Sequence, residues 1–551
     1  MGDFKKIMAN SSEKMKLRAE LMSVLNKYTT AIEIDNDQLK NDIEILKEFP
    51  DREFLCKALF KELLGKDNLY TNVCAIIIIE AVENEIFEAQ VYDLLKDEKV
   101  SDDKKFYFIS ILKQKGLTFD YDTIDNYIMH PEELAQNGVK DFLNNAIEDP
   151  EVQLDLLDFY VNIPEDERLS LLNNLIEEFQ GDDLGNALSL IAQLDNLSVV
   201  ELEYLVNGLI KAKSSYSIEG LRHILNNYKF DKKSTKTITT ATKEIEFAHP
   251  NFINTALIKD TKVLSAYMSF IDGNSNFSLT LSRLRENKTV DVVLITINIM
   301  QGITSCMGFG SINQENYNAV MNRVFSDSIP IKIPPSILKG LSKYYYEKNK
   351  KLKIQLPYEY IVWKNLFNDI KDLKGDVAEI INSKLDTVNL TERKVRKFSS
   401  SNLLSRWYYL YGQNEHIDEL IKTLEQEHIV DMEKINELTE KLTQEKFVND
   451  KNYRLELQTR LLLQSYAAFQ ADLKMMSANA YSLCFENPYI PILVNSIIDK
   501  SLYCYFAQKI EDIEEGIEEN VFKNEIESKY TKEEAVILME QLEEKWNQKK
   551  E

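Results

Sequence analysis

Residues 38–228 form a succession of short amphipathic segments with only brief polar breaks between them. Within each segment, apolar residues recur every three or four positions, which is the spacing of a helix that buries one face. The first of these stripes comprises Leu39, Ile43, Leu46 and Phe49. Because a pair of helices of roughly 10 to 16 residues each is too small to enclose a core, neighbouring pairs must stack on one another. The pattern therefore predicts an array of stacked helix pairs.

In this pairing and stacking, residues 38–250 resemble the HEAT/armadillo-like class of helical repeat proteins. The resemblance is one of pattern, and it implies an irregular α-solenoid over the N-terminal half of the chain. An irregular helical array is the alternative, because the length of the successive units drifts. Helical repeats serve mostly as binding scaffolds for unrelated partners, so the class implies a binding role without identifying the partner.

Glycine and proline are scarce, with 16 and 11 among 551 residues. This leaves little turn chemistry, which disfavours a large all-β fold and an open α/β enzyme rich in glycine loops. Hydrophobic residues make up 44% of the chain and charged residues 28%, a composition that can bury several cores. We therefore expect a mostly α protein that ends in a helical domain.

Residues 263–330 follow a different period, because apolar and polar residues alternate there as in a half-buried strand. One face of the first strand is expected to carry Leu264, Ala266, Met268 and Phe270. A second alternating strand follows turn residues 272–276, and its apolar face comprises Phe277, Leu279 and Leu281. Further strands are expected at 290–299 and 303–309, and a helix at 313–325. The segment predicts a small central antiparallel β-meander plus helix.

These patterns divide the chain into five parts. The expected parts are an N-terminal helical lead-in at 1–37, a HEAT-like helical repeat region at 38–260, a small α/β element at 263–330, a helical domain with a basic and aromatic segment at 331–510, and an acidic connector with a terminal amphipathic helix at 511–551.

One short motif partly matches a metal-binding loop, and another is a glycine-rich segment between an expected strand and an expected helix. Residues 272–276, Asp-Gly-Asn-Ser-Asn, match the first three ligand positions of an EF-hand loop, but Phe277 and Arg283 stand where that loop needs Gly and Glu. A hairpin turn explains these residues without a metal ion. Residues 308–311, Gly-Phe-Gly-Ser, match no phosphate-binding pattern and are expected as the exit of a strand.

Histidine and cysteine show no arrangement typical of a metal site or a nucleophile. The five histidines lack metal-ligand spacing, and the five cysteines include no Cys-x-x-Cys pair. The sequence therefore predicts no catalytic residue, no metal and no cofactor. The longest apolar run, residues 73–79, is far below the ~18 residues of a membrane span, and no secretory signal is evident at the N-terminus. We expect a cytoplasmic protein that does not enter a membrane.

Charge is strongly uneven along the chain. The whole sequence has 66 Lys and Arg against 90 Asp and Glu, a net charge of −24. Residues 141–210 contain 16 acids and a single base, Arg168, whereas residues 339–406 contain 15 bases and 8 acids. The acidic surface expected to bind a partner comprises Asp155, Asp158, Glu165, Asp166, Glu177, Glu178, Asp182 and Asp183.

Basic and aromatic residues interleave in the second of these regions, a combination that can hold phosphates and stack bases. The interaction patch expected there comprises Lys339, Lys343, Tyr344, Tyr345, Lys348, Lys350, Lys351, Lys353, Arg393, Lys394, Arg396, Lys397, Arg406 and Trp407. Ordinary solvated helix faces are one alternative, and docking of this basic region on the acidic helices is another.

The sequence favours a non-enzymatic scaffold or adaptor that binds a protein partner with a basic surface. One alternative is a nucleic-acid-binding accessory protein that uses residues 339–411, although the net charge of −24 counts against it. Another is an enzyme with a site in residues 263–330, where Asp272, Arg283 or Ser305 would have to converge on a pocket. The oligomeric state stays open.

Overall fold

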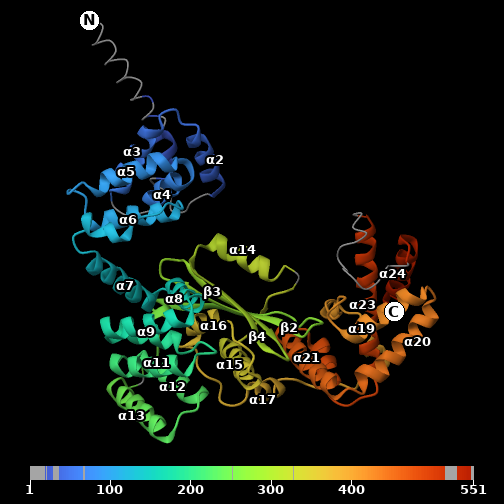
Figure 1. Ribbon diagram of the computed structural model, residues 1–551. Helices are drawn as coiled ribbons and strands as arrows, with labels where there is room; N and C mark the ends of the chain where they lie inside the picture. Colours follow the sequence, from blue (N-terminus) through green and yellow to red (C-terminus); the bar gives the residue numbers. More distant parts are fainter. Residues whose placement is uncertain are drawn as a thin grey trace. The chain divides into compact units, whose positions relative to one another are not determined.

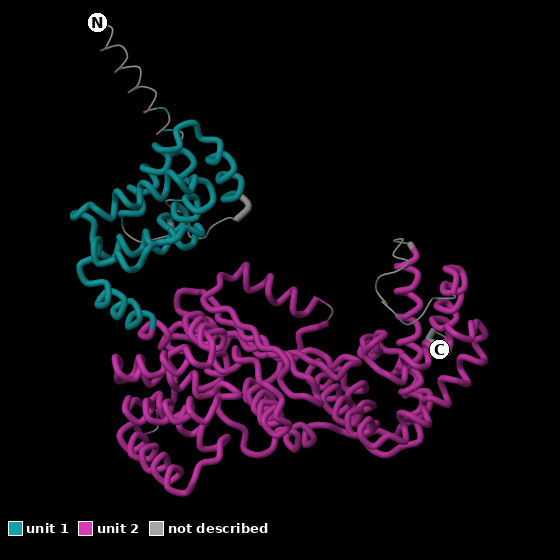
Figure 2. Tube along the Cα trace, viewed as in Figure 1, with its two compact units in different colours: residues 1–142 teal, residues 143–551 magenta. Residues whose placement is uncertain are grey.

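The computed structural model describes residues 36–65, 69–250, 252–326, 328–514 and 530–547, together with residues 16, 19 and 21–28. Two compact units divide the chain, residues 1–142 and residues 143–551 (Figure 2). The described part is mostly helical and contains one five-stranded antiparallel sheet, which confirms the predicted mostly α class with a small central sheet. Most of the predicted lead-in at 1–37, and residues 515–529 of the predicted acidic connector, lie outside the described residues.

The first unit is helical over its described residues. Its helices are α2 (Asn36–Lys47), α3 (Arg52–Leu63), α4 (Leu69–Ala81), α5 (Asn84–Leu95), α6 (Asp102–Gln114), the short 3₁₀ helix η1 (Tyr121–Asn126) and the start of α7 (Pro131–Glu148). From α2 to α6, each helix packs against the next but one, and their apolar stripes form one core. Lys115 donates hydrogen bonds to three carbonyl oxygens at the end of α4, which satisfies acceptors that a helix end leaves open.

The second unit begins with a helical array. Its helices are α8 (Pro150–Asn162), α9 (Glu165–Glu178), α10 (Gly181–Ile191), α11 (Val199–Ala212), α12 (Ser217–Asn227) and α13 (Lys232–Ala248). Contacts join α8 to α10, α9 to α11, α10 to α12 and α11 to α13. Side chains cap the starts of two of these helices: Asp149 caps α8, and Ser198 with Glu201 forms a capping box on α11.

The sheet follows the array. Its strands are β1 (Thr261–Met268), β2 (Asn276–Arg285), β3 (Val290–Asn298), β4 (Gly302–Ile312) and β5 (Ile331–Lys332), in the order β4-β3-β2-β1-β5. Strands β1 to β4 form the predicted meander. The sequence did not predict β5, which pairs with the end of β1. Two residues between prolines are too few to show an alternation of apolar and polar side chains.

Helices cover both faces of the sheet (Figure 1). The helix α14 (Gln314–Val324) packs on one face, where Tyr317 meets Val290 and Val292 and accepts a hydrogen bond from Ser282. The helices α15 (Pro335–Leu352) and α16 (Glu359–Trp363) pack on β4, and the ring of Tyr345 meets that of Phe277. The two faces of β2 therefore pack against different helices, one against α14 and the other against α15.

One predicted side-chain position in β1 is wrong. Leu264 was expected on the same buried face as Ala266 and Met268, yet it is 39% exposed while they are 2% and 0% exposed. The pairing of β1 with β2 shifts register between Val263 and Ser265. Such a bulge adds one residue to one strand, so the alternation before it is reversed relative to the alternation after it.

The elements that follow α16 include a set of helices with its own core. These elements are the 3₁₀ turns η3 (Lys364–Phe367) and η4 (Asn402–Leu404), α17 (Val377–Asn382), α18 (Glu392–Ser399), α19 (Glu415–Glu427), α20 (Met432–Leu442), the π-helical turn η5 (Thr443–Val448), α21 (Lys451–Gln470), α22 (Lys474–Leu483), α23 (Ile490–Glu514) and α24 (Lys532–Asn547). Residues from α18 to α24, with Trp407 and Tyr409, form that core.

Candidate functional site

The predicted acidic residues lie on the first helices of the array. Asp155 and Asp158 belong to α8, the pairs at 165–166 and 177–178 lie at the two ends of α9, and the pair at 182–183 begins α10. All of them are exposed except Asp183, which is half-buried. The exposed acids, which together we call the acidic surface, are Asp155, Asp158, Glu165, Asp166, Glu177, Glu178 and Asp182.

The only base of this region is engaged within the fold. Arg168 donates hydrogen bonds to the carbonyl oxygens of Ile163 and Val161, and its guanidinium lies over the ring of Tyr160. It therefore caps the end of α8, because those carbonyls have no helical partner. Among the described residues, no Lys or Arg forms an ion pair with a member of the acidic surface. Asp158 and Asp182 accept hydrogen bonds from the hydroxyl groups of Tyr358 and Ser214, and the surface as a whole faces solvent.

Two acids of this surface occupy positions that the dipole of their helix disfavours. Glu177 and Glu178 occupy the last turn of α9, which carries no base. The dipole of a helix disfavours a negative charge at that end by about 0.3–1 kcal/mol for an exposed residue. Beside the acids of α8, Phe159 and Val161 are 55% and 39% exposed. The exposed apolar groups thus lie on α8 beside Asp158, whereas the acids that oppose the helix dipole lie on α9.

The first half of the predicted basic and aromatic patch lies on α15, and part of it is used internally. Lys339 donates a hydrogen bond to the Ile370 carbonyl, and Lys348 donates one to the Ile299 carbonyl at 2.5 Å. Tyr345 is buried. The members that remain exposed on or after this helix are Lys343, Tyr344, Lys351 and Lys353.

The second half of that patch packs on a different core. The helix α18 carries Arg393, Lys394, Arg396 and Lys397 and packs against α22 and α23, whereas α15 packs against the sheet. Arg396 pairs with Glu392 on its own helix. Arg406 is exposed, but Trp407 is fully buried. The residues that sequence reasoning grouped as one patch are therefore distributed over two layers of the unit.

Docking of the basic region on the acidic array, left open by the sequence, is seen in the structure. Lys350 donates a hydrogen bond to Asn227 of α12 at 2.9 Å. Lys364 donates hydrogen bonds to Gln193 and to Glu219, the latter at 2.7 Å. Between them, the amide of Leu356 donates to Asp195 at 2.9 Å. Part of the positive charge is thus compensated inside the protein.

The predicted turn at 272–276 connects the sheet to the C-terminal helices. Asp272 accepts a hydrogen bond from the amide of Asn276 at 2.8 Å, so its side chain closes the turn. The amide of Gly273 donates to the Arg406 carbonyl at 2.7 Å, and Trp407 donates its indole N–H to the Ile271 carbonyl at 2.8 Å. These contacts explain the turn residues without a metal ion.

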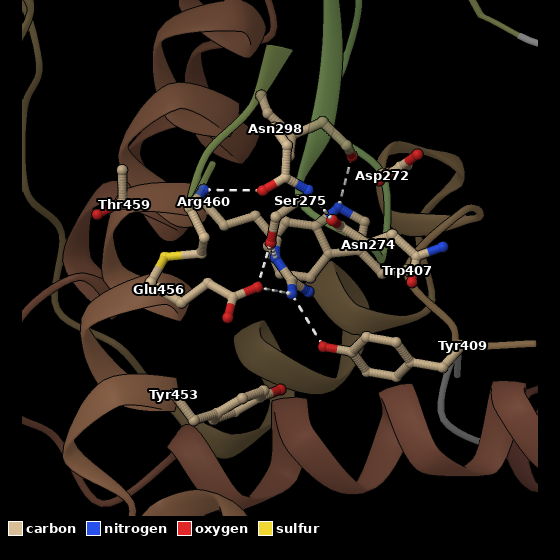
Figure 3. A network of polar contacts seen from close by, with 12 residues as sticks. Asp272, Asn274, Ser275, Asn298, Trp407, Tyr409, Tyr453, Glu456, Thr459 and Arg460 are labelled. Atoms are coloured by element: carbon tan, nitrogen blue, oxygen red, sulfur yellow. Dashed lines mark hydrogen bonds and ion pairs between the residues drawn. The ribbon is translucent and has the colours of Figure 1, made fainter. Parts of the chain in front are cut away.

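Arg460 of α21 lies at the centre of the same connection (Figure 3). It is fully buried, and it donates hydrogen bonds to Ser275, Tyr409 and Glu456 at 3.0–3.2 Å. Its guanidinium carbon lies 4.9 Å from the ring centre of Trp407. A buried cation requires such partners, because desolvation of an unpaired charge is costly. The network joins the sheet, the loop at 407–409 and α21, and Arg460 itself presents no surface to a ligand.

The residues named for an enzymatic site serve separate roles. Arg283 is buried and forms two hydrogen bonds with Asp369 at 2.8 and 2.7 Å, whereas Asp272 belongs to the turn and Ser305 is exposed. Gly308, expected at a strand exit, lies within β4 against the indole of Trp363. A Cβ there would come within 2.1 Å of that ring, so packing requires this glycine.

Sequence reasoning missed a polar pocket of about 240 Å³ in the second unit. It lies among α10, α12, residues 252–254 and the segment at 365–368. Its polar lining comprises Asn186, Ser189, Gln193, Ser215, Tyr216, Glu219, Arg222, Asn254, Asn365 and Asn368. Isolated Asn and Ser residues from four segments form no motif, so only a known tertiary arrangement brings them together.

The described residues contain no group of three or more His, Cys, Asp or Glu side chains that could hold a metal ion. None of their helices combines the length and the apolar character that a membrane span requires. Comparison of the chain with protein-family models, with curated proteins and with solved structures found no match.

Proposed function

We propose that this protein is a non-enzymatic scaffold that binds a protein partner with a basic surface through the acidic surface of α8, α9 and α10. The observation that carries the proposal is the exposure of these acids, without ion-pair partners among the described residues, beside the exposed ring of Phe159. Complementary charge speeds association and excludes acidic partners, while a desolvated aromatic group supplies affinity.

We also propose that α8 to α13 form a short α-solenoid. The contacts between each helix and the next but one support this arrangement, since two layers of alternate helices would produce them. Such an array is a rigid platform, and the basic segment that packs on it would stiffen it further. The five free cysteines support a reducing compartment such as the cytoplasm.

The proposal is tested by affinity purification from the native cells with and without nuclease. The test variant combines Asp155→Asn, Glu177→Gln and Glu178→Gln. The control combines Glu433→Gln, Glu437→Gln and Glu440→Gln, three exposed acids of α20. Both change the net charge by the same amount, so a general charge effect cancels.

We expect a stoichiometric protein that resists nuclease, is released by salt, is retained by the control and is lost from the test variant. Because Glu177 and Glu178 oppose the dipole of α9, the test variant should unfold at an equal or higher temperature than the wild type. Equal retention by the test variant, or loss of the bound material on nuclease treatment, would overturn the proposal.

A further inference from the structure

The lining of the polar pocket is buried to an unusual degree for such residues. Asn186, Ser189, Gln193, Ser215 and Asn365 are all less than 8% exposed. Polar side chains at such positions normally have hydrogen-bond partners, because leaving one unsatisfied costs about 1–3 kcal/mol. The hydrogen bonds of these side chains therefore indicate what the pocket is built to hold.

Part of this hydrogen-bonding capacity is used within the protein. The Nδ2 of Asn186 donates to the Ala146 carbonyl at 2.9 Å, and the Oδ1 of Asn365 accepts from Asn368 at 3.2 Å. The remaining capacity comprises Asn186 Oδ1, Asn365 Nδ2 and the hydroxyl groups of Ser189 and Ser215, for which the described residues supply no partner. A ligand in the pocket therefore meets an acceptor, a donor and two hydroxyls.

The charges of the lining are already compensated. Glu219 accepts a hydrogen bond from Lys364 at 2.7 Å, and Arg222 pairs with Glu246 at 2.8 Å. Among the described residues of the lining, every cation and every carboxylate therefore already has a partner of opposite charge. Because the charges of the lining already compensate one another, the pocket favours an uncharged ligand.

We propose that this pocket binds the backbone of an extended, uncharged peptide segment, and that the segment belongs to the partner of the proposed function, on which this inference rests. A peptide group offers one N–H donor and one C=O acceptor, which match Asn186 Oδ1 and Asn365 Nδ2. Leu190, Ile218 and Ile253 supply apolar walls for its side chains. A pocket of about 240 Å³ is smaller than the ~300–1,000 Å³ that holds a drug-sized ligand, so it fits only a short stretch of chain.

The test uses acetyl-alanyl-alaninamide as the probe in ligand-observed saturation-transfer NMR with the full chain. The test variant is Ser189→Ala with Ser215→Ala. Because these hydroxyls have no hydrogen-bond partner among the described residues, the substitutions should leave thermal unfolding unchanged. Ser170→Ala, at an exposed position of α9, is the control. Glucose and inorganic phosphate are the competing probes for a polyol site and an anion site.

We expect saturation transfer to the dipeptide with wild type and control, and an affinity about tenfold lower with the test variant, as the loss of two neutral hydrogen bonds implies. No transfer to the dipeptide, equal affinity in wild type and test variant, or stronger transfer to glucose or phosphate would overturn the inference. If the dipeptide does not bind, but the partner is retained by the wild type and lost from the acidic-surface variant, only the pocket proposal is refuted. If the dipeptide binds as expected, but retention of the partner does not depend on the acidic surface, only the acidic-surface proposal is refuted.

Discussion

Lys364 donates a hydrogen bond to Glu219 across 2.7 Å, and through this pair the positively charged segment meets the acidic helical array. The two side chains are 21% and 42% exposed, so water screens the pair only in part. The contact also explains why the basic region is not simply a free surface, since a base that would otherwise face solvent is used to hold one layer of the unit on another.

A double-mutant cycle measures this contact. Lys364→Met and Glu219→Gln, alone and together, should give a coupling of about 0.5–1 kcal/mol in the free energy of urea unfolding. The coupling should decrease at high salt, because the pair is partly exposed. A coupling of zero at low salt would show that the pair does not hold the two layers together.

His223 lies four residues after Glu219 on α12. It should make the contact between α12 and the basic segment sensitive to acid. Burial, together with the positive charges of Lys350 and Lys364, lowers the pKa of His223 from 6.5 to about 3. The folded protein therefore binds this proton less readily than the unfolded chain. The contribution of the neutral His223 to the free energy of unfolding is complete above about pH 6.5. It is lost as the pH falls from there towards about 3, and the free energy of unfolding then decreases by at most about 1.4 kcal/mol per pH unit.

We expect His223→Gln to reduce the loss of stability between pH 7 and pH 5 relative to the wild type. Urea unfolding at each pH measures it, and His130→Gln, at an exposed position, is the control. If His223→Gln leaves the pH dependence as steep as in the wild type, His223 does not carry this sensitivity.

Gly308 and Gly138 should respond in opposite ways to the same substitution. A Cβ at Gly308 would lie 2.1 Å from the buried ring of Trp363, so Gly308→Ala should destabilise the second unit by about 1–3 kcal/mol. At Gly138, inside α7, a Cβ meets nothing within 4 Å, so Gly138→Ala should stabilise by about 0.5–1 kcal/mol. Thermal unfolding of both variants checks the signs, and a neutral Gly308→Ala would contradict the packing described for β4.

Arg460 should contribute through its hydrogen bonds rather than through its bulk. Arg460→Met keeps the length of the side chain but removes the partners of Ser275 and Tyr409, and we expect a loss of about 2–4 kcal/mol in urea unfolding. Arg460→Lys should not restore the wild-type value, because an ammonium cannot reproduce the planar set of donors. Full stability of the methionine variant would show that the network does not hold the sheet to α21.

Much of the secondary structure could be predicted, because it depends on local periods. The alternation of Phe277, Leu279 and Leu281 with serine and threonine correctly predicted the strand β2. The burial of Thr280 and Ser282 on its other face could not be predicted, because it depends on the packing of α14 on that face. The exposure of Leu264 could not be predicted, because the bulge that causes it exists only in the pairing of two strands. The two-residue strand β5 was missed because its identity depends entirely on its partner, β1.

The site could be predicted only where solvent exposure follows from charge. Acids such as Asp155 and Glu177 were expected on the surface and are found there. The burial of Trp407 could not be predicted, since its indole bonds to Ile271, which lies 136 residues away in the chain. The same is true of the polar pocket, because Asn186 and Asn365 come together only after the basic segment packs on the array.

Cross-linking of the natively purified complex tests the central claim most directly. A zero-length reagent that joins carboxylates to amines, followed by mass spectrometry, reports which acids touch a lysine of the partner. The account predicts cross-links from partner lysines to the acidic surface, with Asp155, Glu177 and Glu178 among the acids joined. Cross-links confined to acids elsewhere, or running instead from partner carboxylates to the lysines of α15 and α18, would contradict it.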